Sequence, residues 1–183
     1  MASLPASTAD AVAYFQKHGI YYLEDAIIGI VVKEVDDKCL SRNLDSWRYF
    51  KDLVLRNTRL RSILEPFLHE TNPRICYTFG AEPGRFFCFL PQAGLSHRML
   101  VSVWSAGTKL ELVEGSHIGP LKAVQASNGL FEVPAKKGSP IQLDEGGIAI
   151  LDVRFVLQRK AGFTIFYGME KEQKEQNGQK EDV

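Results

Sequence analysis

The residue pattern changes near Pro73, and this change constrains the fold more than any other feature of the sequence. Before Pro73, apolar residues recur at the three- and four-residue spacing of amphipathic helices. After it, short apolar runs are separated by Gly and Pro, which is typical of β-strands joined by turns. Helices followed by strands predict an α+β fold. We expect a β-sandwich or jelly roll with the N-terminal helices packed on one sheet.

The first expected helix has clear start and stop signals. Ser7 with Asp10 forms a capping-box pattern, and Gly19 is typical of a residue that ends a helix. The expected helices span residues 7–17, 27–35, 44–56 and 58–68. The expected strands span residues 20–23, 75–79, 86–90, 100–104, 110–113, 148–153 and 163–167. The strands at 86–90 and 163–167 are apolar almost throughout, which predicts cover on both faces by the core and helices, with a partner chain as the alternative for part of it.

Composition excludes several classes of function. Lys plus Arg and Asp plus Glu each number 22, so no net field attracts the chain to nucleic acid or to an anionic membrane. No apolar run approaches the ~20 residues of a membrane span, and the first residues do not resemble a signal peptide. We therefore expect a cytoplasmic protein with one domain at 1–169 and a disordered polar tail at 170–183. Its three cysteines, Cys39, Cys76 and Cys88, are expected to be free thiols that are mostly buried.

The four histidines do not form a recognisable metal motif. A facial iron site needs two imidazoles and one carboxylate, and in strands the first two ligands usually come as His-x-Asp or His-x-Glu. None of the histidines has an acid two places later; they are His18, His69, His97 and His117. A substitute metal site built from His97, His117 and Glu111 or Glu114 is the alternative, and its spacing does not require convergence.

Several segments in order resemble the phytanoyl-CoA dioxygenase family of non-haem iron, 2-oxoglutarate-dependent oxygenases, in particular the fungal members that oxidise meroterpenoids. The similar segments are 9–23, 82–85, 97–99, 101–107, 114–117 and 146–157. The resemblance places His97 at the first iron-ligand position, Met99 at the carboxylate position and Leu157 at the distal histidine position. Two of the three ligands are therefore absent, and the resemblance implies that His97 is vestigial.

The resemblance also places a basic residue, which would pair with the co-substrate carboxylate, about ten positions beyond the distal ligand. That region is Phe166-Tyr167-Gly168, and the nearest cations, Arg159 and Lys160, come much too early in the chain. We therefore predict no catalytic, cofactor-binding or metal-binding residues in this chain. Iron and 2-oxoglutarate are expected in a partner.

The resemblance thus implies a double-stranded β-helix (jelly-roll) sandwich and the role of a non-catalytic subunit of a heterodimeric oxygenase for a fungal natural product of the meroterpenoid type. It would stabilise a homologous catalytic subunit and help to shape its pocket, through interface residues that the sequence does not identify. The first alternative is a metal-independent isomerase or cyclase that uses Tyr77, Glu111 or Tyr167 for proton transfer. The second is a small-molecule binding protein. Asp152 and Arg154 face the same side of a strand and are expected to form a surface ion pair, with a pair to another subunit as the alternative.

Overall fold

The computed structural model describes residues 7–68, 72–92, 98–134 and 137–171. The helices are α1 (Thr8–His18), α2 (Ala26–Asp37), the 3-10 helix η1 (Leu44–Tyr49), α3 (Lys51–Leu55), α4 (Thr58–Leu64) and the 3-10 helix η2 (Glu65–Phe67). The strands are β1 (Ile20–Glu24), β2 (Ile75–Phe79), β3 (Phe86–Cys88), β4 (Arg98–Trp104), β5 (Thr108–Val113), β6 (Val124–Gln125), β7 (Phe131–Val133), β8 (Ser139–Leu143), β9 (Gly147–Asp152), β10 (Val156–Ala161) and β11 (Thr164–Glu170).

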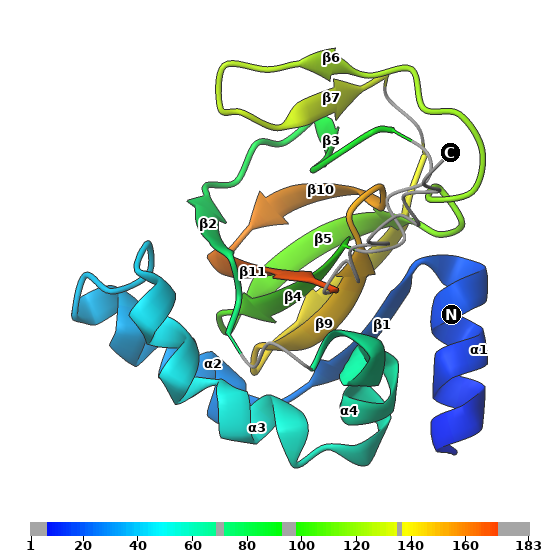
Figure 1. Ribbon diagram of the computed structural model, residues 1–183. Helices are drawn as coiled ribbons and strands as arrows, with labels where there is room; N and C mark the ends of the chain where they lie inside the picture. The colour runs from blue at the N-terminus through cyan, green and yellow to red at the C-terminus, as the bar shows by residue number, and fades with distance from the viewer. Residues whose placement is uncertain (1–6, 69–71, 93–97, 135–136, 172–183) are drawn as a thin grey trace, which may run out of the picture.

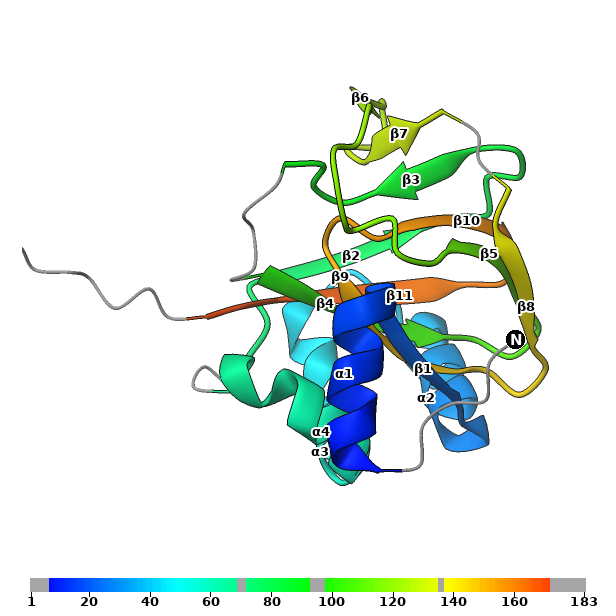
Figure 2. The same ribbon diagram turned by 90° about the vertical axis from the view of Figure 1, so that its right-hand side faces the viewer.

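The strands form two antiparallel sheets. The first sheet has the order β1-β9-β4-β11-β2, and the second has the order β6-β7-β3-β10-β5-β8. Helices α2, α3 and α4 cover the outer face of the five-stranded sheet, while the six-stranded sheet lies on its other side (Figure 1). Helix α1 lies beside α4 and β1, as Figure 2 shows from the side. The predicted α+β sandwich, with N-terminal helices on one sheet, is confirmed.

Two large apolar clusters hold these layers together. The helix-side cluster fills the space between the helices and the five-stranded sheet, and the inter-sheet cluster fills the space between the two sheets. Strand β11 contributes to both, since Ile165 and Tyr167 face the helices and Phe166 faces the other sheet. Burial on both faces explains why this strand is apolar throughout, as predicted. A third, smaller apolar cluster covers the outer side of β3 in the six-stranded sheet. Leu121 and Ala123, in the loop before β6, pack against it.

The first helix begins and ends where the sequence predicts. The Ser7 hydroxyl accepts a hydrogen bond from the backbone N–H of Asp10 at 3.1 Å, and Gly19 adopts φ +77° with its N–H donated to Phe15 O. The helix predicted at 44–56 is instead divided into η1 and α3. The tighter 3-10 turn lets the Ser46 hydroxyl contact the hydroxyl of Tyr167 at 2.6 Å beneath the helices.

Four strands lack the apolar pattern used for prediction: β6, β7, β8 and β10. Strand β8 contains Pro140, which is tolerated because β8 lies at the edge of its sheet. In β10 the apolar start is followed by the polar run 158–160, which hides the strand in the sequence. Strand β11 continues through Glu170, the first residue of the expected tail, and the part of that tail from 172 onward lies outside the described residues.

The cysteines are free thiols, as predicted, but only Cys88 is buried; Cys76 is half-buried and Cys39 is exposed. Burial raises the pKa of the Cys88 thiol to about 11. Within the described residues, no helix combines the length and the apolar character needed to cross a membrane.

Candidate functional site

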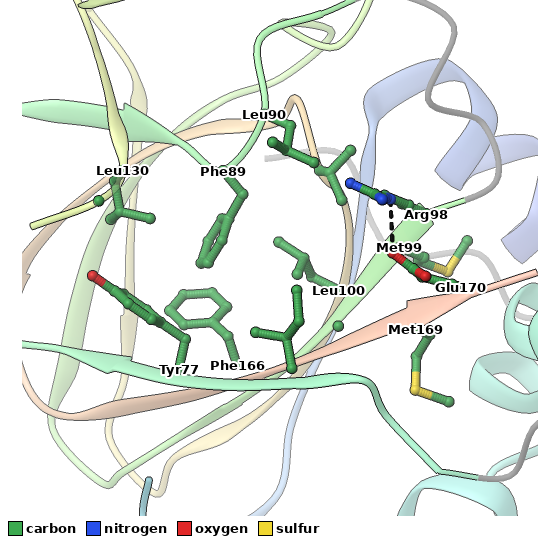
Figure 3. A pocket seen from close by; sticks show the side chains of 14 residues that line it. Tyr77, Phe89, Leu90, Arg98, Met99, Leu100, Leu130, Phe166, Met169 and Glu170 are labelled. Atoms are coloured by element: carbon green, nitrogen blue, oxygen red, sulfur yellow. Dashed lines mark ion pairs between the residues drawn. The ribbon is translucent and has the colours of Figure 1, made fainter. Parts of the chain in front are cut away.

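An apolar pocket of about 180 Å³ opens at one edge of the sandwich, beside the start of β4 and the end of β11, where Met99 and Met169 border it. Aromatic and aliphatic side chains line it from β2, β4 and β11 of the five-stranded sheet and from the loops that follow β3, β6 and β9 (Figure 3). The residues labelled in the figure are Tyr77, Phe89, Leu90, Arg98, Met99, Leu100, Leu130, Phe166, Met169 and Glu170. The lining favours an apolar ligand.

One ion pair lies at the mouth of this pocket. Arg98 and Glu170 are register partners on β4 and β11, and Arg98 Nε lies 2.8 Å from Glu170 Oε1. Both side chains are about one-third exposed, so solvent screens the pair. These two residues carry the only formal charges among the described residues of the lining.

The pocket wall is held by aromatic contacts and one hydroxyl. Phe166 stacks on Phe79, with ring centroids 5.3 Å apart and an interplanar angle of 7°, and lies 4.7 Å from the ring of Phe89. The Tyr77 hydroxyl donates to the backbone oxygen of Asn128 in the β6–β7 loop. Because that proton is used in a structural hydrogen bond, Tyr77 is a wall residue in this conformation.

The two positions predicted to have lost their ligands belong to different parts of the core. Met99 is 5% exposed and packs in the helix-side cluster, where it also borders the pocket. Leu157 is 3% exposed and packs in the inter-sheet cluster on β10, opposite Phe87 and Leu112. His97 lies outside the described residues. The assignment of Met99 and Leu157 as former ligand positions stays a prediction, and both positions are now apolar packing positions.

The pocket residues do not fit an iron site. Such a site needs two imidazoles and a carboxylate on converging positions. Among the described lining residues no histidine is present, and the carboxylate of Glu170 is paired with Arg98. Across the described ranges, no group of three or more His, Cys, Asp or Glu side chains is placed to hold a metal. We therefore derive no chemical step through iron.

The Gly-Ser-His loop at 115–117 contacts both α1 and β10 through its side chains. The Ser116 hydroxyl accepts from Val156 N at 2.8 Å, and His117 Nε2 lies 2.9 Å from the backbone oxygen of Gln16 in α1. The His117 side chain is therefore a structural contact between this loop and the backbone of α1. Gly19 packs against the His117 ring so closely that a Cβ at position 19 would overlap it.

The Arg154 side chain also binds this loop, in place of the predicted surface ion pair with Asp152. Its side chain is 9% exposed and donates to the backbone oxygens of His117, Gly119 and Pro91. Asp152 Oδ1 accepts from the backbone N–H of Arg154 at 2.8 Å. Burial raises the pKa of the Asp152 carboxyl, against the lowering effects of that N–H and of the nearby His117 and Arg154.

The other candidate residues are dispersed. Glu114 pairs with His18 at 2.9 Å, while Glu111 pairs with Lys160 on the outside of the six-stranded sheet, so neither joins His117 in a metal site. Tyr167 lies beneath the helices, where burial raises the pKa of its hydroxyl strongly. Tyr77, Glu111 and Tyr167 therefore do not share a pocket, and the structure offers no proton-transfer set built from these three.

Sequence reasoning missed Arg159, which it treated as a cation too early in the chain. The side chain is 1% exposed and lies between the sheets, with its guanidinium carbon 4.5 Å from the centroid of the Phe79 ring. Burial lowers the pKa of Arg159 to about 10, against a raising effect of Glu82. Lys160, the next residue, faces outward. The alternation of β10 would have revealed the difference, since Arg159 lies two residues from the inward-facing Leu157.

Comparison with known proteins identifies the fold. No family model and no curated protein matches the sequence. Solved structures do: EvdO2 from Micromonospora carbonacea var. aurantiaca has a TM-score of 0.57 at 12% identity, covering 93% of this chain and 94% of that one. HygX from Streptomyces hygroscopicus with iron bound has a TM-score of 0.57 at 11% identity, covering 91% and 88%. SnoK, a non-haem, α-ketoglutarate-dependent carbocyclase from nogalamycin biosynthesis, has a TM-score of 0.52 at 13% identity, covering 92% and 87%. The likeness is one of fold. This chain shares the jelly-roll sandwich fold of these solved structures.

Proposed function

We propose that this chain is a non-catalytic partner subunit of a non-haem iron, 2-oxoglutarate-dependent oxygenase of the same fold. The observation that carries the proposal is the packing of Met99 and Leu157, which are both apolar and both buried in the core. The sandwich is retained while the positions that resemble ligand positions serve packing. A chain that keeps the sandwich fold can still stabilise a homologous chain by packing against it. The resemblance to phytanoyl-CoA dioxygenases suggests a fungal natural product of the meroterpenoid type as the substrate of the complex.

The surface offers a place for such a partner on α2. Ile27 and Ile30 lie one turn apart on this helix and are 49% and 60% exposed. Ile30 lines a shallow hollow together with Gly29, Lys33 and Ala106. Single exposed apolar residues are common on protein surfaces, but two on one helix face beside a hollow favour docking of another chain. We call Ile27 and Ile30 the α2 patch.

Co-expression with an intact oxygenase from the same gene neighbourhood tests this proposal. We expect the two chains to elute together in size-exclusion chromatography, and the oxygenase to be soluble and active only in the complex. Ile30→Ser should weaken the complex, whereas Ile118→Ser, a control at an exposed isoleucine in the loop before β6, should not. Stoichiometric iron and substrate oxidation by this chain alone would refute the proposal.

The pocket supports a second function, the binding of an apolar small molecule. Its aromatic wall suits a ring or chain compound, and Arg98 with Glu170 at the mouth suits one polar group. Leu100→Trp should fill the pocket, since Leu100 lines its base. If an apolar fluorescent probe binds the wild type and this variant equally, the pocket is not the binding site.

A further inference from the structure

The hollow beside α2 has a floor that the fold holds in place. It measures about 530 Å³ and lies between α2 and the two turns that join β4 to β5 and β8 to β9. Gly29 is buried against the second turn so closely that a Cβ at this position would overlap the backbone oxygen of Glu145. The Asp25 N–H donates to Gly146 O in the same turn at 3.1 Å. A surface fixed in this way loses little conformational freedom when another chain docks on it.

Helix α2 is apolar on two faces. A helix on the outside of a sheet normally turns one apolar stripe inward, and α2 does so with Ile28 and Val32, which are 1% and 0% exposed. The α2 patch, Ile27 and Ile30, points to solvent instead. Ile30 lines the hollow, and exposed Ala106 lines it from the turn after β4. The second apolar face therefore borders a ready-made recess.

Three exposed carboxylates, Glu24, Asp144 and Glu145, form an acidic rim at one end of this recess. Glu145 lines the hollow, Asp144 precedes it, and a side-chain oxygen of Glu24 accepts from the Glu145 N–H at 3.1 Å. None of the three forms an ion pair with another described residue. The lysines of α2 and its end, Lys33 and Lys38, each pair with an acid one turn earlier or later on that helix. The rim is therefore negative, and cations of another molecule are complementary to it.

The shape and charge of the recess select one kind of occupant. Its described lining residues belong to one helix and two turns, so no free strand edge is present for an added strand, and a docked helix suits it. A second copy is disfavoured, because a two-fold contact would place two acidic rims against each other. The ends of this chain do not match either. Residues 1–6 contain no Lys or Arg, and residues 172–183 contain one apolar residue, Val183.

We propose that the α2 patch and the acidic rim bind a basic amphipathic helix of the partner chain. Apolar side chains of that helix, three and four residues apart, pack on Ile27 and Ile30. Its Lys or Arg side chains lie beside Glu24 and Glu145. The apolar contact supplies most of the affinity, and the charges select the partner and speed its association. This inference rests on the partner role proposed above and specifies the chemistry of the segment that docks.

Fluorescence anisotropy of the full chain with a labelled helical peptide tests the surface. The probe has one leucine face flanked by lysines, and the control peptide has the same leucine face flanked by glutamates. The basic peptide should bind saturably and more weakly as salt is added, and the acidic peptide should bind at least about tenfold more weakly. Ile30→Ser should weaken binding of the basic peptide by about tenfold, because an apolar contact is lost. Ile118→Ser, at an exposed isoleucine outside the recess, should leave it unchanged.

Two matched double variants test the rim. Glu24→Gln with Glu145→Gln should weaken the basic peptide by about fivefold at low salt and remove most of the salt dependence. Asp52→Asn with Glu65→Gln changes the net charge equally, at exposed acids of α3 and η2, and should retain the wild-type affinity. Equal losses in the two double variants, or equal binding of the basic and acidic peptides, would overturn the assignment.

Co-expression with the oxygenase separates this inference from the partner role itself. An oxygenase that elutes with the wild type and equally with Ile30→Ser and with the Glu24→Gln, Glu145→Gln variant would refute docking on α2 while the partner role stands. A basic peptide that binds as expected, without association of any oxygenase, would refute the partner role while the chemistry of the α2 surface stands.

Discussion

Two buried arginines five positions apart in the chain occupy opposite situations. Arg154, before β10, donates to three backbone oxygens and fastens the loop at 115–119. Arg159, within β10, lies between the sheets with no hydrogen-bond partner among the described residues. A buried arginine whose three nitrogens all donate holds the scaffold together, whereas a buried arginine without hydrogen-bond partners carries a desolvation cost that nothing offsets. The comparison separates an arginine that stabilises the fold from one that does not.

The largest effect is expected from Arg154→Met. Removing the guanidinium leaves the buried carbonyls of His117 and Gly119 without their donor, so the unfolding free energy should fall by about 3 kcal/mol. Urea unfolding measures this loss. Arg154→Lys should recover only part of it, because lysine cannot reach two carbonyls with a fork. A loss below ~1 kcal/mol for Arg154→Met would remove the distinction between the two arginines.

Gly19→Ala tests the contact between the end of α1 and the loop at 115–119. Gly19 has φ +77° and packs on the His117 ring, so alanine should cost about 2 kcal/mol from backbone strain and overlap together. Gly84→Ala is the control, since Gly84 has φ +88° but open space where its Cβ would lie. Equal losses of unfolding free energy in the two variants would show that the contact with His117 contributes nothing.

Arg159→Met should behave unlike Arg154→Met. Among the described residues the buried guanidinium has no hydrogen-bond partner, so exchanging it for an apolar side chain of similar length should change the unfolding free energy by less than ~1 kcal/mol or raise it. Urea unfolding under the conditions used for Arg154→Met gives the comparison directly. A loss as large as that of Arg154→Met would mean that Arg159 is also part of the scaffold.

Asp152→Asn should give the smallest effect, and only in acid. Burial raises the pKa of Asp152 in the folded state above its usual value of 3.8, so the folded chain holds this proton to higher pH than the unfolded chain does. The stability contributed by the protonated form is present below that value and is lost as pH rises through the folded pKa. The unfolding midpoints of both proteins, followed over about pH 3.5 to 6, should show this loss in the wild type and not in the variant. A midpoint difference that stays constant over this range would show that the Asp152 carboxyl is not the group responsible.

The fold could be predicted from the sequence where a single local rule decides the structure. Ser7, Asp10 and Gly19 fix the ends of α1, and the apolar run of β11 reflects its burial between helices and the second sheet. The candidate functional site could not be predicted, because it depends on the register between strands that are distant in the sequence. Arg98 meets Glu170, and Thr164 meets Phe79 and Trp104, only once β11 has paired with β4 and β2. Arg159 was hidden by its neighbours, since Gln158 and Lys160 make β10 look like a polar surface segment.

The near-complete burial of Arg159 also has a consequence for rates. At 1% exposure, no solute can reach its guanidinium unless part of the sandwich opens transiently. The opening frequency would then limit how fast the guanidinium protons exchange with solvent deuterium. The exchange time of those protons would measure how often the two sheets separate.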